Sequence, residues 1–128
     1  MSYSRKVYVK AASALERRRS KAERTQSMHR EEAYAKIPEL ISIDREISSA
    51  GAEVIRAIGM GENAQRFIEE LSKKNLAAQQ RRKDILKENC YPENYLDADY
   101  TCKKCRDTGF VSGVMCDCYK DLLRDTAL

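Results

Sequence analysis

Four of the chain's five cysteines are crowded between residues 102 and 118, as one Cys-x-x-Cys pair and one Cys-x-Cys pair. A Cys-x-x-Cys turn brings two sulfurs to adjacent corners of a tetrahedron, and residues separated by one position share a face of an extended segment. The pattern predicts a zinc site with Cys102, Cys105, Cys116 and Cys118 as ligands. Four thiolates leave no open position on Zn²⁺, so the predicted role of the ion is structural. A pair of disulfides and an iron centre are the alternatives, and we favour zinc because clustered cysteines in a reducing compartment usually bind metal.

The segment between the two cysteine pairs has the composition of a small hairpin. Phe110-Val111 and Val114-Met115 are short runs of strand-forming residues, and Ser112-Gly113 suits a two-residue turn. The residues from Cys118 onward indicate the start of a helix. Residues 100–128 are too few to bury a core of their own, so we expect their order to depend on the metal while the preceding helices persist without it.

Other candidates for chemistry are sparse. Cys90 is either a substitute ligand or a plain, partly buried thiol, and we favour the plain thiol. His29 is the only histidine and lies in a segment with few apolar residues, so a solvent-facing side chain is expected. The stretch GMGENA lies between two helical segments instead of after a strand, and it predicts a helix break at Gly59-Met60-Gly61. Because the chain has neither a GxxxxGK(S/T) loop nor a Ser/His/Asp set, the sequence predicts no enzymatic activity.

Three helical segments must position the cysteine module. The first segment runs from about Ser4 to Lys36 without Gly or Pro. The second begins at Pro38, because proline suits the first turn of a helix. The third could be capped by Asn63 and ends near Asn89. The apolar residues at helical spacing are Val7, Ala11, Ala14, Leu15 and Ala22 in the first segment, Ile37, Leu40, Ile41, Ile47, Val54, Ile55 and Ile58 in the second, and Phe67, Ile68, Leu71, Leu76, Ile85 and Leu86 in the third. The first stripe is thin and can bury only a narrow seam.

These elements predict a mainly α fold, in which an antiparallel helical hairpin or three-helix body precedes a small four-cysteine zinc module with a β-hairpin. The predicted organisation is a helical body for protein interaction at residues 1–89, a connecting loop at 90–99, and the zinc-binding module with the start of a C-terminal helix at 100–128. With 128 residues, of which 34% are charged, the chain can build only a modest core.

The net charge of +4 is concentrated towards the N-terminus. The run from Arg17 to Lys21 either contacts nucleic acid or forms a solvated helix face, and we favour the solvated face because acidic residues flank the run. The tyrosines around the cysteines either stack on bases or cover the metal module, and we favour the covering role. The sequence shows no membrane-spanning run and no secretory leader, so a cytoplasmic protein without a membrane partner is expected.

The segment YPENYLDADYTCKKCRDTGFVSGVMCDCYKDLL resembles the region before the ATPase domain in DnaC/DnaI-type replicative helicase loaders of Gram-positive bacteria and their phages. That family carries a Cys-x-x-Cys, an xDTGx turn and a Cys-x-Cys. The stretches SYSRKVYVKAASALERRR and KIPELISIDREI resemble its N-terminal helices. The resemblance implies a cytoplasmic accessory protein that binds the hexameric, DnaB-type helicase and helps to place it on single-stranded DNA. It also implies an AAA+ ATPase domain after Leu128, which this chain does not include.

The sequence therefore leaves two candidate functions for this chain. In the first, the chain is a zinc-binding, helicase-interacting domain of a helicase loader that acts in primosome assembly. In the second, it is a zinc-stabilised module that binds nucleic acid, including single-stranded DNA. The charge layout favours the first, because the cysteine segment is net acidic. Tyr3, Val7 and Tyr8 are the predicted partner-binding anchors, with closure of the end of a helical hairpin as their alternative role.

Overall fold

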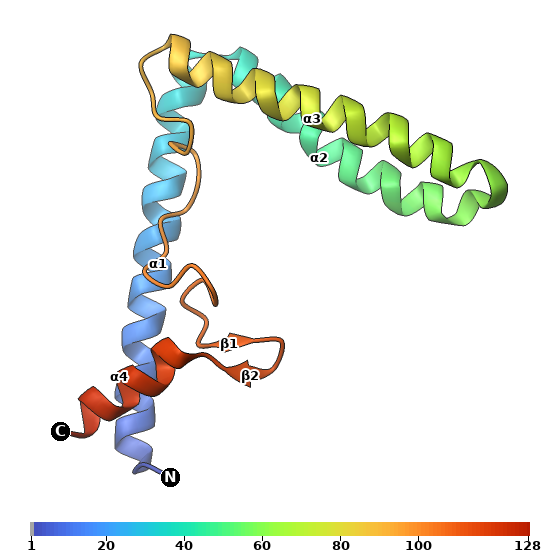
Figure 1. Ribbon diagram of the computed structural model, residues 1–128. Coiled ribbons are helices and arrows are strands. Elements are labelled where there is room, and N and C mark those ends of the chain that lie inside the picture. Colours follow the sequence, from blue (N-terminus) through green and yellow to red (C-terminus); the bar gives the residue numbers. More distant parts are fainter. Residues whose placement is uncertain (1) are drawn as a thin grey trace. The chain divides into compact units, whose positions relative to one another are not determined.

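A computed structural model describes residues 2–128 and shows a mainly helical chain (Figure 1). The elements in order are α1 (Arg5–Lys36), α2 (Glu39–Ala57), the short 3₁₀ helix η1 (Ile58–Asn63), α3 (Ala64–Glu88), β1 (Phe110–Val111), β2 (Val114–Met115) and α4 (Asp117–Ala127). This confirms the predicted fold class, including the β-hairpin beside the cysteines. None of the helices in the described part of the chain combines the length and the apolar composition that a membrane crossing requires.

The chain forms two compact units. Residues 2–28 and 97–128 make up the first, here called the cysteine unit, and His29–Leu96 make up the second, here called the hairpin unit. Helix α1 contributes residues to both units. The units divide the chain differently from the predicted segments 1–89, 90–99 and 100–128, because the first part of α1 groups with the cysteine segment.

The hairpin unit is built on the antiparallel pair of α2 and α3, which lie side by side (Figure 1). The buried residues of the pair are Leu40, Ile43, Ala50 and Ala57 on α2, and Leu71, Ala78, Ile85 and Leu86 on α3. Half-buried Ile47 and Val54 complete a spacing of three and four residues along α2, which is the pattern of a coiled-coil seam. Alanines at this seam allow the two backbones to approach closely.

The predicted apolar stripes of the second and third helical segments are partly wrong. Ile55, Ile58, Phe67 and Leu76 were expected in the seam, but their exposed fractions run from 36% to 74%. A pair of helices buries only one narrow stripe on each partner. Because Ala50, Ala57 and Ala78 occupy that stripe, the larger side chains beside it stay outside.

A polar network joins all three helices of the hairpin unit. The Tyr34 hydroxyl of α1 donates a hydrogen bond to the Asp44 carboxylate of α2, and Arg82 of α3 pairs with the same carboxylate at 2.7 Å. Asp44 interrupts the apolar stripe of α2, and its two partners explain how the interruption is tolerated. Arg81 likewise pairs with Glu46 at 2.9 Å.

We predict that this unit loses stability at alkaline pH. Burial and the hydrogen bond to Asp44 raise the pKa of Tyr34 from 10.0 to about 12, and the hydrogen bond to Glu32 raises the pKa of Tyr95 to about 12. Between pH 10 and pH 12 the folded state keeps tyrosine protons that the unfolded state has lost. The contribution of these protons to the free energy of unfolding is therefore complete below pH 10 and disappears as the pH rises towards 12. In urea unfolding monitored across this range, Tyr34→Phe should reduce the slope of unfolding free energy against pH. An unchanged slope would contradict the assignment.

The loop after α3 packs against the end of α1. The ring of His29 stacks on Tyr95 with centroids 4.1 Å apart, and His29 Nδ1 donates to the Tyr95 carbonyl at 3.0 Å. The Tyr95 hydroxyl donates to Glu32 at 2.5 Å. The expected solvent-facing histidine is therefore wrong: the loop supplies an aromatic partner that lies 66 residues away in the sequence.

The cysteine unit has its own small core, where α4 crosses the first part of α1 (Figure 1). Its buried members are Ala11, Leu15, Tyr119 and Leu123. The predicted anchors Tyr3, Val7 and Tyr8 are half-buried against this cluster, which leaves part of each side chain exposed. The reason is geometric: α4 covers the face of α1 that carries the thin apolar stripe.

Candidate metal centre

Two short segments of the cysteine unit bring four thiols together. The Sγ atoms of Cys102, Cys105, Cys116 and Cys118 all lie within 4.8 Å of one another. The Cys102–Cys116 and Cys105–Cys118 separations are 3.8 and 3.4 Å. A tetrahedral zinc with Zn–S bonds near 2.3 Å requires sulfurs about 3.8 Å apart. The four sulfurs therefore fit one metal ion, and both of these separations are far longer than the roughly 2 Å of a disulfide.

The first pair lies in a tight turn. The amide of Arg106 donates to the Cys102 carbonyl at 2.9 Å, which closes the turn around Cys105. A hydrogen bond from the Cys105 backbone amide lowers the pKa of the Cys102 thiol to about 7. A backbone amide directed at a sulfur stabilises the thiolate, which is the form that binds metal.

The second pair, Cys116 and Cys118, lies at the junction between β2 and α4. Cys116 has extended backbone angles (φ −70°, ψ 148°) and stands at the N-cap position, while Cys118 lies in the first turn of the helix. This is the strand-to-helix junction that allows two cysteines separated by one residue to face one ion. Burial raises the pKa of the Cys118 thiol, a cost that a metal cation would offset. The positive end of the α4 dipole also favours thiolates at this position.

The predicted hairpin connects the two pairs. Phe110 pairs with Met115 and Val111 with Val114, in antiparallel register. Ser112 and Gly113 both have positive φ, at 51° and 80°, as a two-residue hairpin turn of the favoured twist requires. The Cys116 amide donates to the Gly109 carbonyl at 2.8 Å, which ties the base of the hairpin to the second cysteine pair.

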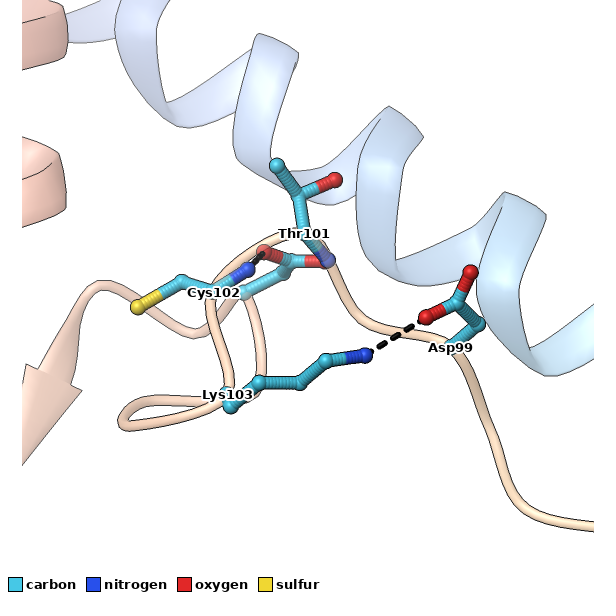
Figure 2. A network of polar contacts seen from close by, with 5 residues as sticks. Asp99, Thr101, Cys102 and Lys103 are labelled. Atoms are coloured by element: carbon cyan, nitrogen blue, oxygen red, sulfur yellow. Dashed lines mark hydrogen bonds and ion pairs between the residues drawn. The ribbon is translucent and has the colours of Figure 1, made fainter. Parts of the chain in front are cut away.

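Sequence reasoning missed the most buried polar side chain of the site. Asp107 has no exposed surface. Its two carboxylate oxygens accept the backbone amides of Thr101 and Cys102, each at 2.9 Å. Figure 2 shows the Cys102 end of this contact, together with the surface ion pair of Lys103 and Asp99. The only sequence feature that points to Asp107 is the DTG turn. The turn supports the family resemblance, but the sequence assigns no structural role to it.

The two residues after Asp107 also have defined contacts. The Thr108 hydroxyl donates to the Cys105 carbonyl at 2.6 Å. Gly109 has a φ of +90°, and a Cβ added there would lie 2.5 Å from Cδ2 of Tyr119 and 3.0 Å from Cδ1 of Leu15. The DTG turn thus requires a hydrogen-bond acceptor at Asp107, a donor at Thr108 and a residue without a side chain at Gly109.

Helix α1 contacts the turn directly. Arg19 Nη1 donates to the Asp107 carbonyl oxygen at 3.1 Å. Within the run from Arg17 to Lys21, which we interpreted as a solvated face, Arg19 is half-buried and has this structural contact. The first part of α1 is therefore part of the support of the metal centre.

Cys90 lies outside the cluster. It is exposed and has a φ of +66°, just after the end of α3. Its amide donates to the Lys87 carbonyl and the amide of Tyr91 donates to Leu86, so Cys90 stands where glycine usually ends a helix. The expectation of a partly buried thiol is wrong, because this end of the helix leaves the side chain in solvent.

Among residues 2–128, the four cysteines are the one group of histidine, cysteine or acidic side chains arranged to hold a metal ion. All four corners of the tetrahedron are protein sulfurs, so the arrangement is suited to a structural ion and offers no site for a bound substrate. Comparison of the chain with protein-family models, with curated proteins and with solved structures finds no match.

Proposed function

We propose that this chain is the zinc-stabilised, helicase-interacting module of a DNA replication helicase loader, which acts in the cytoplasm during primosome assembly. The observation that supports the metal is the gathering of four cysteine sulfurs within 4.8 Å. The loader role rests on the resemblance of the cysteine segment and the first helices to DnaC/DnaI-type proteins. The contacts of the DTG residues support the resemblance, because they give the shared motif a physical role at the metal centre.

Zinc is the ion that the donor set favours. Four thiolates at tetrahedral spacing match the closed structural zinc sites of small modules, whereas magnesium and calcium take oxygen ligands. When bound, the ion would cross-link the turn after Thr101 to the start of α4. These residues have little apolar surface of their own, so a cross-link of this kind would contribute much of their stability.

We predict one zinc ion for each purified chain. Cys102→Ser combined with Cys118→Ser removes one ligand from each pair and should reduce the zinc content to near zero, measured by elemental analysis. Cys90→Ser is the matched control, because Cys90 is exposed and lies outside the cluster, and it should leave the zinc content unchanged. Equal zinc contents in the double variant and the unmodified chain would contradict the ligand assignment.

The first candidate docking surface is the N-terminal patch, formed by Tyr3, Val7 and Tyr8. These side chains pack partly on the core of the cysteine unit and keep the rest of their surface exposed. Tyrosine supplies contact area at low entropic cost, which is why it is common in interfaces. Because the patch rests on α4, its shape would depend on the metal centre that supports α4.

The second candidate is the connection patch, formed by Ile55, Ile58 and Met60 where α2 leads into α3. Their exposed fractions are 74%, 70% and 57%. Three large apolar side chains this exposed within six residues would lose unfavourable contact with water when a partner covers them.

We predict that the zinc-loaded chain binds a DnaB-type replicative helicase. Alanine substitution of all three residues of the N-terminal patch should weaken binding at least tenfold in a calorimetric titration, as expected for tyrosine anchors. The matched comparison is alanine substitution of all three residues of the connection patch. Zinc content and helical circular dichroism are measured for both variants, because the N-terminal patch also contributes to a core.

The outcomes separate the candidates. Weakened binding only in the connection-patch variant would move the docking site to the hairpin unit. If the unmodified chain fails to bind helicase at tens of micromolar, the loader role is wrong. Binding of single-stranded DNA with a steep salt dependence and no helicase binding would favour the nucleic-acid module instead. We expect no ATP hydrolysis by this chain, because it contains no phosphate-binding loop.

A further inference from the structure

Asp107 is the one buried charged side chain among residues 2–128. A carboxylate in such a place is costly unless hydrogen bonds replace its water. It is also not one of the four metal ligands, which are all sulfurs. The chain therefore carries a costly group immediately beside the metal centre, and the contacts of that group indicate its role.

The carboxylate holds the backbone at the first ligand. Its two oxygens accept the amides of Thr101 and Cys102 at 2.9 Å each, so the two consecutive peptide links on either side of the Thr101 Cα are held. The position of the Cys102 sulfur follows from that of its backbone. Hydrogen bonds to a charged acceptor are about twice as strong as neutral ones, so the carboxylate suits this task better than an amide would.

The backbone of Asp107 is itself held in place. Arg106 and Asp107 have positive φ values of 55° and 58°, a conformation that aspartate tolerates better than most residues. Arg19 of α1 donates to the Asp107 carbonyl at 3.1 Å. The side chain thus holds the first cysteine pair while the main chain is anchored to a long helix.

We propose that Asp107 is the positioning residue of the metal centre, holding the Cys102 turn in the geometry that binds the ion, and that Arg19 anchors this turn to α1. The proposal rests on the proposed metal binding and extends it to a residue that is not a ligand. A site arranged before the ion arrives loses less conformational entropy on binding, so its affinity is higher. Groups that orient metal ligands typically contribute 10-fold to 100-fold in affinity.

The test compares Asp107→Asn with Asp99→Asn. Both changes remove one negative charge from the same loop, but Asp99 is 90% exposed and pairs only with Lys103 on the surface. Competition titration with a chelator should show that Asp107→Asn lowers zinc affinity about 10-fold to 100-fold, whereas Asp99→Asn leaves it within about twofold. With Co²⁺ as the probe, Asp107→Asn should also change the visible absorption of the tetrahedral thiolate complex, which loss of stability alone would not change.

A second variant tests the anchor. Arg19→Gln removes the hydrogen bond to the Asp107 carbonyl without touching the carboxylate, and it should lower zinc affinity about fivefold, as expected for one hydrogen bond. Wild-type zinc affinity and Co²⁺ absorption in Asp107→Asn would overturn the positioning role, and wild-type affinity in Arg19→Gln would overturn the anchor. Failure of the unmodified chain to bind zinc or Co²⁺ would instead overturn the metal centre itself. If Asp107→Asn folds only at saturating metal, its affinity is read from the metal dependence of its circular dichroism.

Discussion

Removing the metal from the zinc-loaded chain is expected to unfold the cysteine unit, including residues 5–28 of α1, while the hairpin unit stays folded. Zinc contributes roughly 10–16 kcal/mol to the folding of small zinc modules, and whole domains are usually stable by only about 5–15 kcal/mol. A unit whose buried core consists of Ala11, Leu15, Tyr119 and Leu123 cannot replace a contribution of that size. Its order should therefore depend on the ion.

The loss should extend into α1 because that helix shares its core with α4. Sequence reasoning suggests that all the helices persist without metal, but Leu15 packs in the cluster that contains Tyr119 and Leu123. Loss of the metal would release α4 and also the turn that Arg19 contacts, and an isolated helix with a thin apolar stripe is marginal in water. Helices α2 and α3 have their own seam and do not depend on these contacts.

Hydrogen exchange before and after chelation measures this directly. Amides at residues 5–28 and 97–128 should lose protection, and those of α2 and α3 should keep it. The Cys102→Ser and Cys118→Ser double variant should show the same pattern without chelator. Continued protection of residues 5–28 would mean that α1 is stable by itself, and loss of protection in α2 and α3 would mean that the two units unfold together.

Gly109→Val is expected to destabilise the cysteine unit by roughly 2–5 kcal/mol. A positive φ costs a non-glycine residue about 1–2 kcal/mol, and overpacking a core typically costs a further 1–3 kcal/mol. Both costs apply here, because Gly109 has a φ of +90° and a Cβ would lie 2.5 Å from the Tyr119 ring. That ring also packs edge-on against Phe110 at 5.7 Å, so it has little room to move away.

Gly113 provides the matched control. It has a similar φ of +80°, but a Cβ there meets nothing within 4 Å. Gly113→Ala should therefore cost only the backbone contribution of about 1–2 kcal/mol, and Gly109→Ala should cost clearly more. Denaturant unfolding of the zinc-loaded variants, monitored in the cysteine unit, compares the two positions. Equal losses of stability would show that the close approach of Tyr119 has no energetic effect.

Short-range features of the molecule could be predicted from the order of the residues. Ligand spacing, turn residues and helix breaks act over a few neighbouring residues, so the four cysteines, the Ser112-Gly113 turn and a helix start near Cys118 could all be predicted. The mainly helical fold could be predicted for the same reason, because helical periodicity is a property of one segment.

Which surfaces are buried depends on contacts between residues that are far apart in the sequence. Ala50 and Ala78 occupy the seam in place of Ile55 and Leu76, and this choice depends on the partner helix and not on the hydrophobicity of each residue. His29 gained Tyr95 as a stacking partner in the same way.

The metal centre shows the same division. Its candidate ligands are visible in the sequence because metal coordination limits their spacing. Its support is not visible, because Arg19 and Asp107 are 88 residues apart. A buried aspartate also has no sequence signature of its own, since aspartates in loops are usually exposed. Its burial follows from two backbone amides that need an acceptor, and only the folded chain brings these groups together.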